Sequence, residues 1–95
     1  MMQQPFKKVT PMTERTETIR AVVAQHGQLS ANVADLADGD SLYAAGLTSH
    51  ASVNVMLAIE DEFDIEFPER FLKRSTFESI ENLRSALDEL LDEDS

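Results

Sequence analysis

The sequence predicts an all-α fold, a small four-helix bundle with three longer helices and one short helix. Apolar residues recur at helical spacing in three stretches, near residues 13–26, 49–63 and 77–91. Residues that commonly begin or end helices, among them threonine, serine, glycine and proline, flank these stretches. The chain has 95 residues, of which 42% are hydrophobic, so one small domain with a hydrophobic core is expected.

The N-terminal residues differ in character from the rest of the chain. Residues 1–12 contain Pro5 and Pro11 and show no apolar periodicity, which predicts a flexible leader. The domain itself is expected over residues 13–91, and residues 92–95 form an acidic tail. We find neither an internal repeat nor a second domain in the sequence.

The first helix and the loop after it are predicted from helix caps and apolar spacing. Thr13 or Thr16 can cap the start of the helix, and Gly27 can end it. The apolar positions of this helix are Ile19, Val22 and Val23. A long loop over about residues 28–48 follows, and loops of this length are often functional. The apolar residues of the loop are expected to pack beneath the helices: Leu29, Val33, Leu36, Leu42 and Leu47.

The second helix is predicted over Ser49–Phe63, a length of about 22 Å. One apolar stripe along it is formed by Val53, Met56, Leu57 and Phe63. Val55 and Ile59 widen this stripe, so the helix is apolar on more than one side. Such a helix needs several packing neighbours or a cavity beside it.

Two further segments complete the expected bundle. Pro68 can begin a short third helix over residues 69–72, which would turn Phe71 and Leu72 inward. The residues Ser75–Glu78 match a capping box and therefore predict the start of the last helix. The inward face of that helix is expected to contain Phe77, Ile80, Leu83, Leu87 and Leu90 or Leu91.

The composition argues against several classes of protein. The formal net charge is −10, from 18 acidic and 8 basic residues, which argues against a nucleic-acid binder. The same charge favours encounters with basic partner surfaces, although it also serves simply to keep a small domain in solution. The sequence has no cysteine, no secretory signal and no apolar run of about 20 residues, so a cytoplasmic protein without disulfides or membrane spans is expected.

Ser49 is the leading candidate for a functional residue. It follows the glycine-containing turn Ala45–Leu47 and stands where the apolar helical pattern begins. The unpaired N–H groups and the positive end of the dipole at a helix start favour a phosphate group there. The alternative is that Ser49 is an ordinary N-cap, which is a common role for serine.

The pattern around Ser49 resembles that of the acyl and peptidyl carrier proteins. In that family, a serine at the start of the second helix carries a 4′-phosphopantetheine arm. The resemblance extends over about residues 13–91 and is strongest from Asp40 to Pro68. The matching positions in that stretch are Leu42, Ala45–Leu47, Ser49, Val53, Ile59, Glu60–Phe63, Ile65 and Phe67–Pro68.

The Asp-Ser-Leu triplet that is usual in the family occurs here at a different place. It is found at Asp40–Leu42, in the loop before the glycine turn, where Ser41 is expected to be an ordinary loop residue. Ser49 is flanked by Thr48 and His50 instead, but it keeps the register of the family's attachment serine.

The resemblance implies a carrier that performs no chemistry itself. A phosphopantetheinyl transferase would move the arm from coenzyme A to Ser49, and a cargo-loading ligase or synthetase would attach an acyl or aminoacyl group as a thioester. A downstream transferase would then receive the cargo from this carrier, which is expected to be a monomer.

The resemblance also suggests where partner enzymes dock and what cargo is carried. Docking is expected at Thr48, His50, Asn54, Glu60 and Asp61. Many carriers of fatty-acid synthesis have acidic residues early in the second helix, whereas here the charge begins only at Glu60. A specialised carrier of aminoacyl or other small cargo is therefore expected, rather than the housekeeping fatty-acid carrier.

The same residues give less support to several other functions. Ser49 and His50 point about 100° apart on a helix and lack an oxyanion loop, which argues against a hydrolase. The acidic loop around Gly39 lacks EF-hand spacing, and no metal site is expected. The acidic residues late in the second helix lack an apolar pocket for acid–base catalysis. The remaining alternative is an acidic helical interaction domain that binds a basic partner without a covalent arm.

Overall fold

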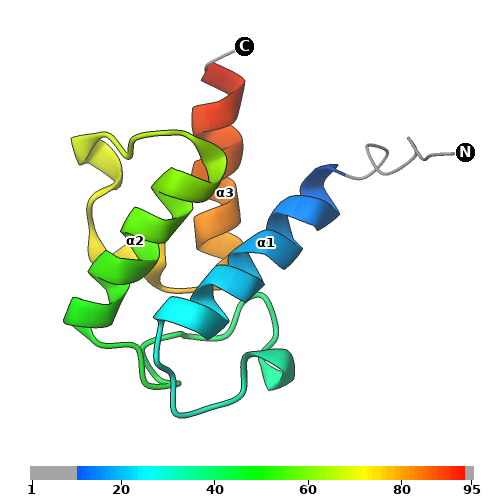
Figure 1. Cartoon of the computed structure of the whole chain (residues 1–95), viewed down its shortest axis with the longest axis vertical. Coiled ribbons are helices and arrows are strands. Elements are labelled where there is room, and N and C mark those ends of the chain that lie inside the picture. Colours follow the sequence, from blue (N-terminus) through cyan, green and yellow to red (C-terminus); the bar gives the residue numbers. More distant parts are fainter. Residues whose placement is uncertain (1–10, 94–95) are drawn as a thin grey trace, which may run out of the picture.

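The computed structural model describes residues 11–93 and contains no β-strand in that range. Its three α-helices are α1 (Pro11–His26), α2 (Ser49–Phe63) and α3 (Ile80–Glu93) (Figure 1). Single 3₁₀ turns, η2 (Val33–Asp35), η3 (Glu69–Phe71) and η4 (Arg74–Phe77), lie between them. The all-α prediction is therefore confirmed, with 3₁₀ turns in place of the short fourth helix.

The observed helix ends agree closely with the predicted ones for α2 and less closely for α1. The bounds of α2 are those predicted, whereas α1 begins at Pro11, two residues before Thr13. Proline suits a first helical position because its fixed φ is helical and the N–H that it lacks would have no partner there. The predicted leader over residues 1–12 otherwise lies outside the described residues, as do residues 94 and 95 of the predicted tail.

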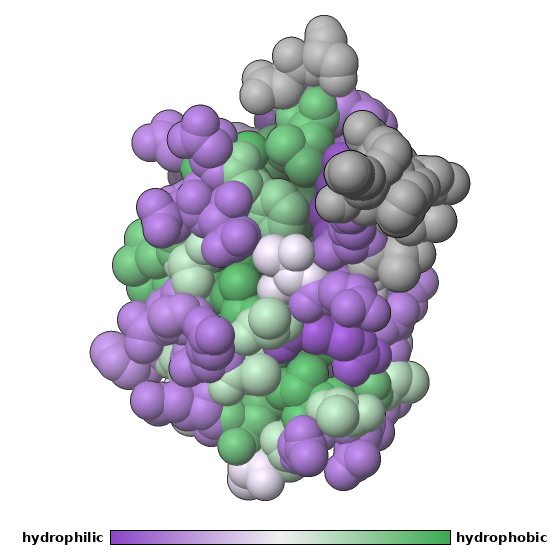
Figure 2. Space-filling view, turned by 45° about the vertical axis from the view of Figure 1, so that its right-hand side comes forward, coloured by the Kyte–Doolittle hydropathy of each residue, from purple (hydrophilic) through white to green (hydrophobic). Residues whose placement is uncertain are grey.

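The core lies where all three helices meet, and α1 packs against both α2 and α3. Its fully buried side chains come from each helix and from the long loop: Ile19, Val23, Leu42, Val55, Ile59, Ile80, Leu83 and Leu87. Of the apolar loop residues, Val33, Leu42 and Leu47 are buried, and Leu29 and Leu36 pack against the core. On the face that Figure 2 shows, hydrophobic residues remain visible between hydrophilic ones.

The long loop is held against the helices by hydrogen bonds rather than left free. The Arg20 guanidinium on α1 donates to the carbonyls of Val33 and Leu36 at 2.9 and 2.7 Å. It also donates to the Asp38 carboxylate at 2.7 Å. Near the other end of the loop, the N–H of Leu42 donates to the carbonyl of Glu78 at 2.7 Å. These bonds fix the position from which α2 begins.

Gly46 makes the sharp turn that leads into α2. Its φ is +116°, a conformation that residues with a side chain rarely adopt. A Cβ atom at this position would also lie 2.8 Å from the backbone nitrogen of Ser30. That N–H donates to the carbonyl of Ala45 at 3.0 Å, so the two loop segments are pressed together. The turn therefore requires glycine on two grounds.

The inward face of α2 differs from the predicted one. The buried residues are Ala51, Val55 and Ile59, whereas Val53 and Leu57 of the predicted stripe are 49% and 53% exposed. The predicted stripe was therefore wrong for these two residues. The helix is apolar around much of its circumference, and the spacing alone does not choose which side meets α1 and α3.

The segment between α2 and α3 also differs from the prediction. Phe71 packs against the core, but Leu72 is 50% exposed rather than turned inward. The predicted capping box over Ser75–Glu78 lies in and after η4, and the hydroxyl of Ser79 accepts the N–H of Asn82 at 3.0 Å instead. Burial of Phe77, whose ring meets that of Phe67 edge-on at 5.8 Å, turns the chain before α3 begins.

Candidate functional site

The start of α2 leaves the Ser49 side chain free of a capping role. Thr48 is the N-cap residue, and its hydroxyl accepts the N–H of Ala51 at 3.0 Å. Ser49 is the first residue of the helix and is exposed. The neighbouring hydroxyl of Ser52 donates to the Ser49 backbone carbonyl at 2.7 Å. The alternative interpretation of Ser49 as the N-cap is therefore wrong.

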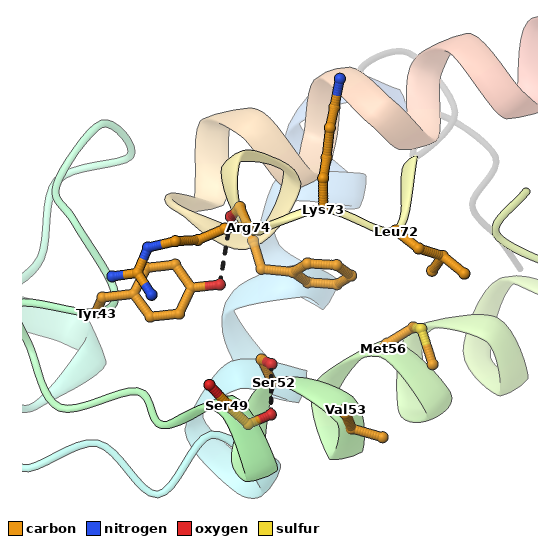
Figure 3. A pocket seen from close by; sticks show the side chains of 9 residues that line it. Tyr43, Ser49, Ser52, Val53, Met56, Leu72, Lys73 and Arg74 are labelled. Atoms are coloured by element: carbon orange, nitrogen blue, oxygen red, sulfur yellow. Dashed lines mark hydrogen bonds between the residues drawn. The ribbon is translucent and has the colours of Figure 1, made fainter. Parts of the chain in front are cut away.

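A groove of about 550 Å³ lies beside Ser49 (Figure 3). Its walls come from the long loop, from α2 and from the segment around η4. The lining is mostly apolar along α2 and across from it, where Val53 and Met56 face Leu72. Phe77 also lines the groove. A serine hydroxyl at the edge of an open groove fits a long covalent attachment, because the attached group has space to lie beside the helix.

An arginine and a tyrosine form the polar end of the groove. The Arg74 guanidinium carbon lies 3.8 Å from the centre of the Tyr43 ring, and the Tyr43 hydroxyl donates to the Arg74 carbonyl at 3.3 Å. Partial burial raises the pKa of Tyr43; the Arg74 cation opposes this rise and the Glu78 carboxylate adds to it. This pair could not be predicted from the sequence, because 31 positions separate its members.

The residues expected to dock partners do not share one environment. His50 and Asp61 are exposed, and Asn54 is partly buried on the same helix. Thr48 is exposed but uses its hydroxyl as the N-cap of α2. The Glu60 carboxylate accepts the backbone N–H of Phe67 at 2.8 Å, so it already stabilises the connection after the helix. No sequence pattern indicated this bond.

The Asp-Ser-Leu triplet at Asp40–Leu42 has a local structural role. The Ser41 hydroxyl accepts the N–H of Ala44 at 3.1 Å and thereby supports the turn before Gly46.

Within residues 11–93, no helix is long and apolar enough to cross a membrane. The same range places no cluster of three or more acidic or histidine side chains that could hold a metal ion.

Comparison with known protein families gives a match that spans most of the domain. The family model described as the phosphopantetheine attachment site matches residues 17–87. The chain belongs to this family. It is a carrier protein whose cofactor is covalently attached 4′-phosphopantetheine.

Two curated relatives of this carrier are aminoacyl carrier proteins. The chain is 49% identical over 75 residues to the aminoacyl carrier protein of Agrobacterium fabrum. The aligned residues cover 79% of this chain and 90% of the relative. It is 39% identical over 54 residues to aminoacyl carrier protein 1 of Bradyrhizobium diazoefficiens, which covers 57% of this chain and 60% of that protein.

Two of the solved structures with the same fold are complexes with a ligase. One is an engineered Bradyrhizobium japonicum glycine:[carrier protein] ligase complexed with carrier protein from Agrobacterium tumefaciens and ATP. The match has a TM-score of 0.76 and 47% identity and covers 78% of this chain and 96% of that chain. Another is the Bradyrhizobium japonicum glycine:[carrier protein] ligase complexed with glycylated carrier protein. Its TM-score is 0.67 at 34% identity, covering 77% of this chain and 97% of that one.

Proposed function

We propose that Ser49 is the attachment residue of this carrier and that its cargo is an aminoacyl group. The observation that carries the proposal is the exposed Ser49 side chain at the first position of α2, beside a groove and relieved of capping by Thr48. The aminoacyl cargo is supported by the relatives, one of which is glycylated in complex with its ligase.

The chain contributes attachment, recognition and tethering to the reaction. When attached, the arm supplies a terminal thiol that holds the cargo as a thioester. The rigid connection from Gly46 to α2 fixes the point of attachment, and a tether of limited length raises the concentration of cargo at a docked enzyme. The chain itself has no catalytic role in this proposal and acts as a cosubstrate of other enzymes.

Three classes of partner follow from this role. They are a phosphopantetheinyl transferase, an ATP-dependent ligase that loads the amino acid, and a transferase that receives it. We place their docking surface on the exposed side of α2, with His50 and Asn54 near Ser49 and with Asp61 at the far end. The exposed Val53 and Leu57 lie between these residues and would add apolar contact area.

The decisive test of attachment is the intact mass after incubation with coenzyme A, Mg²⁺ and a broad-specificity phosphopantetheinyl transferase. One added phosphopantetheine is expected on the parent chain and on Ser52→Ala, a matched control one helical turn away in the same groove. No addition is expected on Ser49→Ala. Attachment to Ser49→Ala, or failure with several transferases on the parent, would refute the assignment.

Cargo is tested separately on the chain that has received the arm. Incubation with glycine, ATP and the Bradyrhizobium japonicum glycine:[carrier protein] ligase should add one glycyl group to it. A fatty-acid synthase acyltransferase should load it poorly. Efficient fatty-acyl transfer with no aminoacyl loading by this or related ligases would overturn the aminoacyl assignment and leave the attachment site intact.

A further inference from the structure

The basic residue at the polar end of the groove differs from the arginines that stabilise the fold. Arg15 and Arg84 both form salt bridges with Asp88, and Arg20 forms one with Asp38. Arg74 is exposed, and the described residues place no carboxylate within salt-bridge distance of its guanidinium. A cation without a carboxylate partner is unexpected in a protein of net charge −10.

The contact with Tyr43 holds the Arg74 side chain without using its hydrogen-bond donors. The guanidinium carbon lies over the ring, 3.8 Å from its centre, and a contact with the ring face leaves the N–H donors available to a ligand. The ring is itself held in place by two hydrogen bonds. The Tyr43 hydroxyl donates to the Arg74 carbonyl, and the N–H of the adjacent Leu42 donates to the backbone carbonyl of Glu78. The ring contact therefore holds the guanidinium at this end of the groove before any ligand binds.

Arg74 and Ser49 line the same groove from different walls, as Figure 3 shows. The side chain of Lys73 extends away from Ser49 in this view, although it too borders the groove. Arg74 is thus the cation at the Ser49 end. A planar guanidinium is well suited to a phosphate, because its parallel N–H groups can donate to two phosphate oxygens together.

We propose that the Arg74 guanidinium, held on the Tyr43 ring, binds the phosphodiester of an arm on Ser49 and directs that arm along the groove. This inference rests on the proposed attachment at Ser49. The phosphodiester adds negative charge to an already acidic chain, and Arg74 compensates it locally. Beyond the phosphate, the apolar wall of Val53, Met56 and Leu72 receives the rest of the arm.

One acidic group, Glu78, acts on the tyrosine that Arg74 contacts. Glu78 is partly buried and close enough to Tyr43 to raise its pKa. It lies in the segment that also carries Arg74, so it tempers the attraction without occupying the Ser49 side of the groove. Because Arg74 is exposed, its effect is expected to be modest, about two- to fivefold in the fraction of arm lying in the groove, and larger at low salt.

The test follows the position of the arm rather than any enzymatic activity. The sequence has no cysteine, so the terminal thiol of the arm is the single thiol of the loaded protein and can carry a nitroxide spin label. Paramagnetic broadening is then measured by NMR on residues 72–77 and on the methyl groups of Val53, in the parent, Arg74→Met and Lys73→Met. The two variants lose the same charge from neighbouring positions.

Each outcome bears on a different part of the inference. Intact mass is measured first, and a parent chain that gains no arm overturns the attachment site and this inference with it. With the arm present, strong broadening along the groove is expected in the parent, a two- to fivefold smaller effect in Arg74→Met and little change in Lys73→Met. Equal broadening in all three proteins, or an equal loss in both variants, overturns the role of Arg74 and leaves attachment at Ser49 standing.

Discussion

The two ends of α2 use their polar side chains in different ways. At the N-terminal end, Thr48 caps the helix and leaves the adjacent Ser49 exposed beside a groove. At the C-terminal end, Asp64 adopts a left-handed conformation, and the Glu60 carboxylate accepts the N–H of Phe67. Negative charge is unfavourable at a helix C-terminus, so this end needs such compensation. A charged residue of α2 is thus a structural residue, whereas the proposed attachment residue on the same helix is uncharged.

The largest expected effect separates function from stability at the N-terminal end. Ser49→Ala should abolish arm attachment and change the free energy of unfolding by less than about 0.5 kcal/mol, because surface residues without special contacts contribute little. Thermal unfolding of the apo protein checks the second part. A large loss of stability in Ser49→Ala would mean that this hydroxyl is structural and that the two ends are alike.

The next effect concerns the C-terminal end. Glu60→Ala removes the acceptor of the Phe67 N–H, and Phe67 is only 6% exposed. A buried donor left without a partner should destabilise the protein by about 1–2 kcal/mol. Urea unfolding measures this loss in the free energy of unfolding. The control is Glu62→Ala, because Glu62 is exposed on the same helical turn. Equal stability of the two variants would show that Glu60 is free to act in docking alone.

A smaller effect is expected when the cap of α2 is removed. Thr48→Ala deletes the acceptor of the Ala51 N–H and should cost about 1 kcal/mol of stability. Thr48→Ser keeps an acceptor and should recover most of this loss in the same unfolding experiment. Arm attachment to Thr48→Ala should continue, since Ser49 remains. A loss of attachment with unchanged stability would reverse the roles of these two residues.

The smallest expected effect concerns docking at Asp61. This residue is exposed, so Asp61→Lys should leave stability nearly unchanged and weaken binding to a basic ligase surface by about 0.2–1 kcal/mol. Binding measured at low and at high salt should show a smaller difference at high salt, because salt screens exposed charges. An effect that is independent of salt would mean that Asp61 acts through shape rather than charge.

Much of the chain could be predicted from its sequence because local signals agreed there. The bounds of α2 followed from the glycine turn and from an apolar pattern that ends at Phe63. The start of α3 could not be predicted in the same way. The segment Ser75–Glu78 satisfies the capping pattern, yet the burial of Phe77 against Phe67 places a 3₁₀ turn there. A local pattern was thus overruled by the packing of two rings.

The position of Ser49 at the start of a helix, the acidic surface and the all-α class were determined by the sequence, since each depends on residues close together in the chain. The choice of buried face on α2, the bond from Glu60 to Phe67 and the stacking of Arg74 on Tyr43 were decided by the tertiary structure. The buried face of α2 and the contact of Arg74 with Tyr43 depend on elements that are distant in the sequence. The bond from Glu60 forms where the buried Phe67 brings the connection after α2 back to the helix. An amphipathic pattern specifies that a face is buried, and only the neighbouring elements determine which face it is.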